Sequence, residues 1–142
     1  MKKTSVVIAF DFGLKRIGCA IGQNLTNTAN PLGTISNSSS GIDWNRIEQW
    51  IEEWQPDKLI IGKTKKADGS KSDLDEAINI FANKLRKKNI PVDYVDEARS
   101  SIEAREILKI KRRIGSNKKI KKEMIDAISA SIIAERWLKY NN

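Results

Sequence analysis

The segment of residues 6–18 ends an apolar strand in an acid, Asp11, and then carries two glycines, Gly13 and Gly18. A carboxylate at the tip of a buried strand is held where water and a cation can reach it, and a glycine lets a phosphate or a metal approach the backbone. Two cations that could bind phosphate follow at once, Lys15 and Arg16. The segment therefore predicts a site for a cation and a phosphate. A plain β-hairpin with an Asp-x-Gly turn is the alternative, because Asp and Gly are ordinary turn residues.

Asp126 is the second acid whose position suggests chemistry. Ala130, Ile133 and Trp137 follow it at four, seven and eleven residues, so in a helix the acid lies on the stripe that packs toward a sheet. An unpaired buried carboxylate is strongly disfavoured, so Asp126 must be protonated, hydrogen-bonded, paired with a base or neutralised by a cation. A metal ion and an ion pair with a lysine both remain open.

Two further acids, Asp96 and Glu97, end a predicted strand. Neighbouring side chains point to opposite faces of a strand, so only one of the two can face a site. The chain has no histidine, which excludes Ser-His and Cys-His nucleophile pairs and His-ligated zinc. Hydrolysis would have to use lysine, or carboxylates with a hard metal such as Mg²⁺ or Mn²⁺. Cys19, the only cysteine, excludes an internal disulfide and is predicted to pack in the core.

The chain has 26 Lys and Arg against 18 Asp and Glu, a net charge of +8 that favours a polyanionic partner. Residues 105–122 hold nine basic residues against the single acid Glu106, which accounts for the whole excess. These bases are Arg105, Lys109, Lys111, Arg112, Arg113, Lys118, Lys119, Lys121 and Lys122. A nucleic-acid surface is predicted there, with a merely solvated charge run as the alternative.

The elements that must position these residues follow from the apolar patterns. Strands are predicted at residues 5–11 and 16–22, with a short edge strand at 32–36 after a polar loop at 23–31, and a loop at 37–41. Asp43 is predicted to cap a helix that ends at Pro56 and carries a Trp and Ile stripe toward the core. A strand at 58–62, a helix at 73–88 and a strand at 92–95 follow.

Helices at about 100–109 and 119–139 complete the order, with a basic loop between them. The three sequential strands predict an antiparallel meander, and the alternating strands and helices predict parallel neighbours. The sequence thus predicts one α/β domain over residues 1–142, with a mixed five-stranded sheet flanked by helices, as in ribonuclease-H-like proteins. The first apolar run is too short for a membrane span or a signal-peptide core, so a cytoplasmic protein without a membrane partner is expected.

The run DFGLKRIGCA resembles the opening motif of the YqgF family, Holliday-junction-resolvase-like nucleases proposed to process the 5′ end of 16S ribosomal RNA precursors. The matching residues are Asp11, Gly13, Lys15, Arg16, Ile17, Gly18 and Ala20. The resemblance continues through residues 60–70, 90–104 and 121–138. It implies a ribonuclease-H-like fold and metal-assisted phosphodiester hydrolysis, with two ions about 4 Å apart.

The resemblance also implies roles for single residues. Asp11, Glu97 and Asp126 would be the catalytic metal ligands, with Asp11 bridging two ions and Glu97 favoured over Asp96. Gly13 and Gly18 would allow close backbone approach. Arg99 stands near the position of the family's arginine and is expected to bind nucleic acid. From residue type and the charge pattern, the other nucleic-acid-binding residues are expected to be Lys15, Arg16, Lys111, Arg112, Arg113, Lys118, Lys119 and Lys122. The chain departs from its relatives in two places: Arg99 stands one residue later than the family's arginine, and Gly62-Lys63 stands where resolvases place an acid.

The function expected from these features is an Mg²⁺- or Mn²⁺-dependent nuclease that acts on structured RNA. Two alternatives stay open. A Holliday-junction resolvase would act on branched DNA and must be a stable dimer to cut two strands symmetrically. A non-catalytic RNA-binding assembly factor would keep the binding surface without the chemistry. The expected assembly for the RNA nuclease is a monomer or a weak homodimer.

Overall fold

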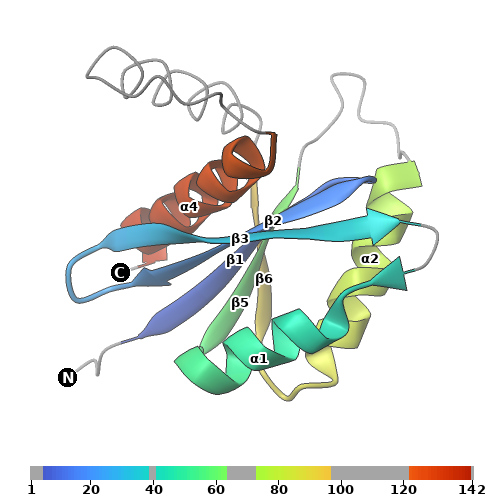
Figure 1. The fold of residues 1–142 in the computed structure, drawn as a ribbon. Helices are drawn as coiled ribbons and strands as arrows, with labels where there is room; N and C mark the ends of the chain where they lie inside the picture. Colours follow the sequence, from blue (N-terminus) through green and yellow to red (C-terminus); the bar gives the residue numbers. More distant parts are fainter. Residues whose placement is uncertain (1–4, 39–40, 64–72, 97–121, 142) are drawn as a thin grey trace, which may run out of the picture.

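A computed structural model of the chain describes residues 5–38, 41–63, 73–96 and 122–141. Its strands form one sheet in the order β4-β3-β2-β1-β5-β6 (Figure 1). The strands are β1 (Val6–Phe12), β2 (Arg16–Gln23), β3 (Thr28–Ser38), β4 (Gly41–Ile42), β5 (Lys58–Lys63) and β6 (Val92–Asp96). The helices are α1 (Trp44–Trp54), α2 (Asp73–Arg86) and α4 (Lys122–Asn141). The helix expected at about 100–109 lies outside the described residues.

The sheet is mixed, as the sequence predicts. Strands β1, β2 and β3 form an antiparallel meander, and β5 runs parallel to both β1 and β6. Two expectations are wrong. The sheet has a sixth strand, because β4 pairs with the end of β3, so β3 is not an edge strand. In addition, β3 begins at Thr28, within the expected polar loop. Its first residues pair with β2 through the backbone while their side chains stay largely exposed, so the strand leaves no apolar pattern in the sequence.

Helices cover both faces of the sheet, with α1 and α2 on one and α4 on the other (Figure 1). The side chains of β1 alternate between these two layers. Ile8, Phe10 and Phe12 pack in the core with α1 and α2, whereas Val7 and Ala9 pack under α4. Asp11 follows Val7 and Ala9 in this alternation, two residues after Ala9. The period of two therefore places this carboxylate on the face that α4 covers.

Helix α1 follows the sequence closely. The side chain of Asp43 accepts a hydrogen bond from the backbone N–H of Arg46 at 3.2 Å, which is the expected N-cap. The helix ends where Gln55 takes a left-handed conformation, one residue before Pro56. Of the predicted stripe, Trp50 is buried, but Trp54 at the last turn is 41% exposed.

Helix α4 carries the stripe predicted from Asp126. Ala130 and Ile133 are fully buried, and Ile133 joins the apolar cluster under the sheet. A separate cluster of Ile128 and Ile132, with Ile125 against it, makes this helix apolar on a second side. Among the described residues, no helix combines the length and the apolar composition that a membrane span requires.

Candidate functional site

The Asp-x-Gly segment forms the turn of the β1–β2 hairpin. The backbone N–H of Gly13 donates a hydrogen bond to the carbonyl of Arg16 at 3.0 Å. A Cβ at Gly13 would lie 2.7 Å from that same carbonyl oxygen, so closure of the turn requires glycine here. The hairpin that the sequence offered as an alternative is thus present. The hairpin is compatible with the predicted site, because its turn holds the end of β1 that carries Asp11.

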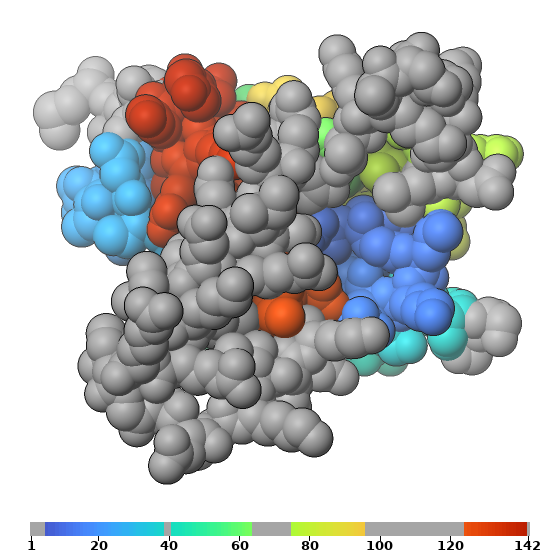
Figure 2. Space-filling view, turned by 90° about the horizontal axis from the view of Figure 1, so that it is seen from above, coloured from blue at the N-terminus to red at the C-terminus, as the bar shows by residue number. Residues whose placement is uncertain are grey.

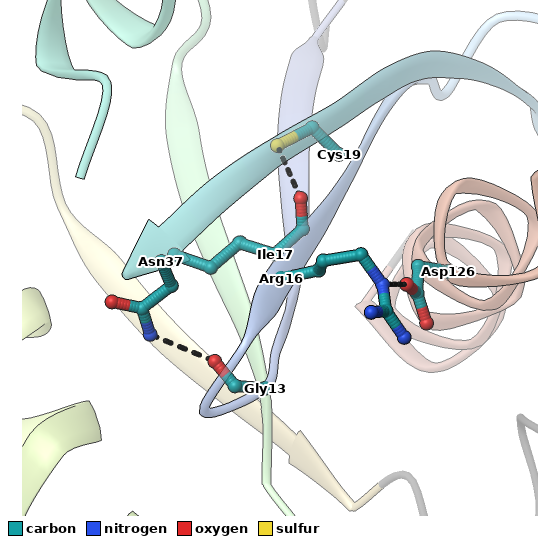
Figure 3. Close-up of polar contacts among 6 residues, drawn as sticks. All are labelled: Gly13, Arg16, Ile17, Cys19, Asn37 and Asp126. Atoms are coloured by element: carbon teal, nitrogen blue, oxygen red, sulfur yellow. Dashed lines mark hydrogen bonds and ion pairs between the residues drawn. The ribbon is translucent and has the colours of Figure 1, made fainter. Parts of the chain in front are cut away.

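Asn37, near the end of β3, fastens this hairpin at two points. Its side-chain Nδ2 donates a hydrogen bond to the carbonyl of Gly13 at 2.8 Å (Figure 3). Its backbone N–H donates to the carbonyl of Lys15 at 2.9 Å. Sequence reasoning placed Asn37 in a loop and missed this role. The only available signal was its residue type, since Asn side chains often bind nearby backbone groups.

Gly18 explains how Asp11 and Asp126 come together. Asp11 pairs directly with Gly18 across the β1–β2 ladder. A Cβ at Gly18 would overlap the backbone carbonyl oxygen of Asp126, so the absence of a side chain lets the start of α4 lie directly on β2. The two acids are therefore neighbours across one glycine. Figure 2 shows this end of the molecule, where the blue atoms of the hairpin lie beside the orange atoms of α4.

Asp126 forms an ion pair with Arg16, the first residue of β2. The Nε of Arg16 donates to the Oδ2 of Asp126 at 2.8 Å (Figure 3). Both side chains are partly exposed, at 33% for Arg16 and 26% for Asp126. Of the possibilities that the sequence left open for this acid, the structure contains the ion pair, with an arginine in place of the lysine considered. The pair joins a residue expected to bind metal to one expected to bind nucleic acid.

The charge of Asp11 also affects the buried thiol of Cys19. Burial strongly raises the pKa of the Cys19 thiol, and the negative charge of Asp11 raises this pKa further. The thiol is fully buried and donates a long hydrogen bond, 3.7 Å, to the carbonyl of Ile17 (Figure 3). Cys19 is therefore protonated and inert at neutral pH, which confirms its predicted role in packing.

The end of β6 lies near the acids, but the third expected ligand is not described. Asp96 ends this strand opposite Lys63 of β5, and Glu97 follows it outside the described residues. Gly62 stands beside Asp11 in β5, so that strand adds no carboxylate at this position. Within the described ranges, no group of three acidic or cysteine side chains lies close enough to hold a metal ion.

Most of the expected nucleic-acid-binding residues also lie outside the described residues. Lys15 is exposed at the tip of the hairpin, next to Arg16. Lys122 begins α4, although only its backbone is described. The predictions for the other residues stay untested: Arg99, Lys111, Arg112, Arg113, Lys118 and Lys119.

The fold is that of ribonuclease-H-like Holliday-junction resolvases. A structure of Thermus thermophilus RuvC in complex with a Holliday junction substrate matches with a TM-score of 0.59 at 12% identity. The match covers 96% of this chain and 97% of that one. A complex of Fowlpox virus resolvase with Holliday junction DNA matches with a TM-score of 0.57 at 18% identity. It covers 95% and 97% of the two chains.

The chain belongs to the RuvX family, whose family model, described as Holliday junction resolvase, matches residues 5–140. Two similar relatives are both named "Putative pre-16S rRNA nuclease". The one from Haemophilus ducreyi is 42% identical over 139 residues, which cover 96% of this chain and 98% of the relative. The one from Nitrosococcus oceani is 40% identical over 137 residues, which cover 96% and 88%. The family expected from the opening motif is thereby confirmed.

Proposed function

We propose that this chain is a metal-dependent nuclease that processes the 5′ end of the 16S ribosomal RNA precursor in the cytoplasm. The observation that carries the proposal is the convergence of Asp11 and Asp126 from opposite ends of the chain across Gly18. The names of the relatives supply the substrate, and membership in a resolvase-like family supplies the reaction class.

The donor set fits a hard divalent cation. Carboxylate oxygens without histidine or accessible thiol are the ligands that Mg²⁺ and Mn²⁺ prefer. Arg16 already stands at Asp126 as a counter-ion, so the carboxylate of Asp126 is placed where a cation can reach it. When bound, a divalent ion would lower the pKa of a water nucleophile and stabilise the leaving 3′ oxygen. We assign ligand roles to Asp11, Asp126 and Glu97.

The remaining residues of the site would hold and orient the substrate. The backbone of Asp11 is held by strand pairing on both sides, with β2 and with β5, so the side chain starts from a fixed position. Lys15 and Arg16 stand next to it on a hairpin that Asn37 fastens, so their cations can bind phosphates at a set distance from the acids. Arg99 and the basic residues between 105 and 122 would extend this phosphate-binding surface.

A Holliday-junction resolvase is the second candidate, because the solved structures with this fold include resolvases bound to junction DNA. Symmetric cutting of two strands needs two active sites related by a two-fold axis, and hence a stable dimer. An RNA nuclease has no such requirement and can act as a monomer or a weak homodimer. Preference for a four-way junction together with stable dimerisation would favour the resolvase.

The test is cleavage of precursor ribosomal RNA and of a four-way DNA junction, each with Mg²⁺, Mn²⁺ or a chelator. Asp11→Asn and Asp126→Asn should each lower RNA cleavage by at least about a hundredfold, because each removes a charge that the transition state needs. Asp93→Asn is the matched control. Asp93 also carries an ion pair, to Lys58 at 3.2 Å, and accepts a hydrogen bond from Trp137 at 3.3 Å. It lies two strands away from Asp11, near the start of β6 and two residues before the position in register with Asp11.

Both variants should stay folded. Asp126→Asn breaks an ion pair whose partners are partly exposed, so its cost in the free energy of unfolding should stay below about 1 kcal/mol. Wild-type cleavage by either variant in Mg²⁺ would show that the carboxylate mechanism is wrong. RNA binding without any cleavage by the unmodified protein would favour the non-catalytic assembly factor.

A further inference from the structure

The ion pair between Arg16 and Asp126 places a cation where the proposed metal would act. The guanidinium Nε lies 2.8 Å from Oδ2, which is a charge-assisted hydrogen bond. The pair lies at the solvent boundary, since each side chain keeps a quarter to a third of its surface exposed. An ion pair in such a position is weak enough to be replaced by a stronger ligand.

A divalent ion and the guanidinium compete for the same carboxylate. An ion held by Asp11 and Asp126 would lie close to Arg16, because Gly18 separates the two acids and stands two residues from Arg16 on β2. Two cations at such a short separation repel each other. Asp126 therefore cannot bind the divalent ion and the guanidinium at full strength at the same time. Metal binding should weaken its interaction with Arg16.

The position of Arg16 gives the released guanidinium a second anion to bind. Its backbone is fixed at the start of β2, and the carbonyl of the same residue closes the turn with Gly13. The long side chain can swing toward solvent beside Lys15, which is exposed at the hairpin tip. Under the proposed function, a phosphate of the nucleic acid occupies that space, and arginine binds phosphate oxygens in a bidentate way.

We propose that Arg16 is an exchangeable counter-ion that couples metal binding to nucleic-acid binding. Without metal, it neutralises Asp126 and is withheld from phosphate. With metal at the acids, it is released and binds the backbone of the substrate. The coupling is reciprocal, so nucleic acid must tighten metal binding by the same factor. This inference rests on the proposed function for its ligands, but it is tested by binding alone.

The first arm measures Mn²⁺ binding to the protein without nucleic acid, by calorimetry or by the electron paramagnetic resonance signal of free Mn²⁺. Arg16→Gln should bind Mn²⁺ about fivefold more tightly or better, because the competing cation is gone. Arg16→Lys keeps the charge and should lie nearer the wild type. Lys58→Gln is the control, since Lys58 also pairs with a carboxylate but at the other end of the sheet. Unchanged or weaker Mn²⁺ binding by Arg16→Gln overturns the proposal.

The second arm measures binding of a short single-stranded RNA by fluorescence anisotropy, with Mn²⁺ or with chelator. Mn²⁺ should tighten binding to the wild type and leave Arg16→Gln nearly unaffected. In chelator, Asp126→Asn should bind RNA more tightly than Asp93→Asn, although both lose one paired carboxylate, because only the former removes the ion pair between Asp126 and Arg16. Equal affinities of these two variants would contradict the exchange.

The outcomes separate this inference from the proposed function. Coupled binding of Mn²⁺ and RNA without cleavage would support the exchange and contradict the nuclease. Metal-dependent cleavage with the same Mn²⁺ affinity in the wild type and Arg16→Gln would support the nuclease and contradict the exchange.

Discussion

At the scale of single residues, the site combines what the sequence could predict with what it could not. The helical phase of Asp126 predicted that this acid faces the sheet, and the structure packs the start of α4 on β2 at Gly18. The sequence placed Asp11 only at the end of a buried strand, and its pairing with Gly18 brings it to the same place. The sequence did not identify Arg16 as the ion-pair partner of Asp126. An ion pair between residues 16 and 126 depends on how closely α4 approaches β2, and no local pattern encodes that distance.

Asn37 offers a test of whether the hairpin must be held rigidly. Asn37→Ala removes the hydrogen bond to the Gly13 carbonyl and should lower the free energy of unfolding by about 1 kcal/mol. It should also lower cleavage by about tenfold or more, because a small displacement of catalytic groups slows a reaction strongly. Denaturant unfolding and single-turnover cleavage measure the two effects.

Asn24 provides the matched control for Asn37. Its Oδ1 accepts a hydrogen bond from the backbone N–H of Ser5, also at 2.8 Å, at the end of the sheet away from Asp11. Asn24→Ala should cost similar stability and leave cleavage unchanged. If both alanine variants cleave at the same rate, Asn37 serves only the stability of the fold.

At the scale of elements, strands with an apolar pattern were predictable and strands without one were not. The buried β1, β2 and β5 fall within one residue of their expected bounds. By contrast, β4 has only two residues, and the first part of β3 is exposed on both sides of Ala29. Backbone pairing holds most of these residues, and only Ala29 and Ile42 among them pack against the apolar clusters. Backbone groups are the same in nearly every residue, so such pairing leaves little signal in the sequence.

Close packing of α4 on β2 is the element-scale feature on which the site depends. Gly18→Ala would place a Cβ against the backbone carbonyl of Asp126, which can yield only if the helix moves. We expect a decrease of about 1–3 kcal/mol in the free energy of unfolding. We also expect cleavage to be abolished under conditions where the variant is still folded, because the shift separates Asp126 from Asp11.

Gly22→Ala is the control on the same strand and the same face. Its Cβ would lie 3.2 Å from Ala134 Cβ and from Leu138 Cδ1, so the leucine methyl and the local backbone of α4 need to shift by only a few tenths of an ångström, far less than at Gly18. This variant should therefore keep its cleavage rate even where its stability decreases. An equal decrease in cleavage in both variants would show that the packing of α4 in general, and not its close approach at Asp126, controls the site.

At the scale of the whole molecule, the cations form a basic run in the sequence and a separate group at one end of the sheet. The chain's excess of +8 resides in residues 105–122, a run that ends at Lys122, the first residue of the helix that presents Asp126. Other cations lie at the C-terminal ends of α2 and α4, far from the acids: Lys84, Arg86, Lys87, Lys88 and Lys139. The end of α4 packs near the start of β1, since Leu138 lies against Gly22 and beside Val7, so these cations mark the opposite end of the sheet.

Two variants that lose the same charge at different places can therefore test whether the position of the cations matters for nucleic-acid binding. Replacing Lys111, Arg112, Arg113, Lys118 and Lys119 by Gln should weaken binding to all nucleic-acid sequences. For each phosphate that the variant no longer binds, the log-log salt slope should fall by about 0.9 on duplex DNA, or about 0.7 on a single strand. Replacing Lys84, Arg86, Lys87, Lys88 and Lys139 by Gln removes the same charge and should leave the slope nearly unchanged. Titrations at several salt concentrations decide between them. Equal slopes in the two quintuple variants would mean that the basic run only adds net charge, and that phosphates are bound by Lys15, Arg16 and their neighbours alone.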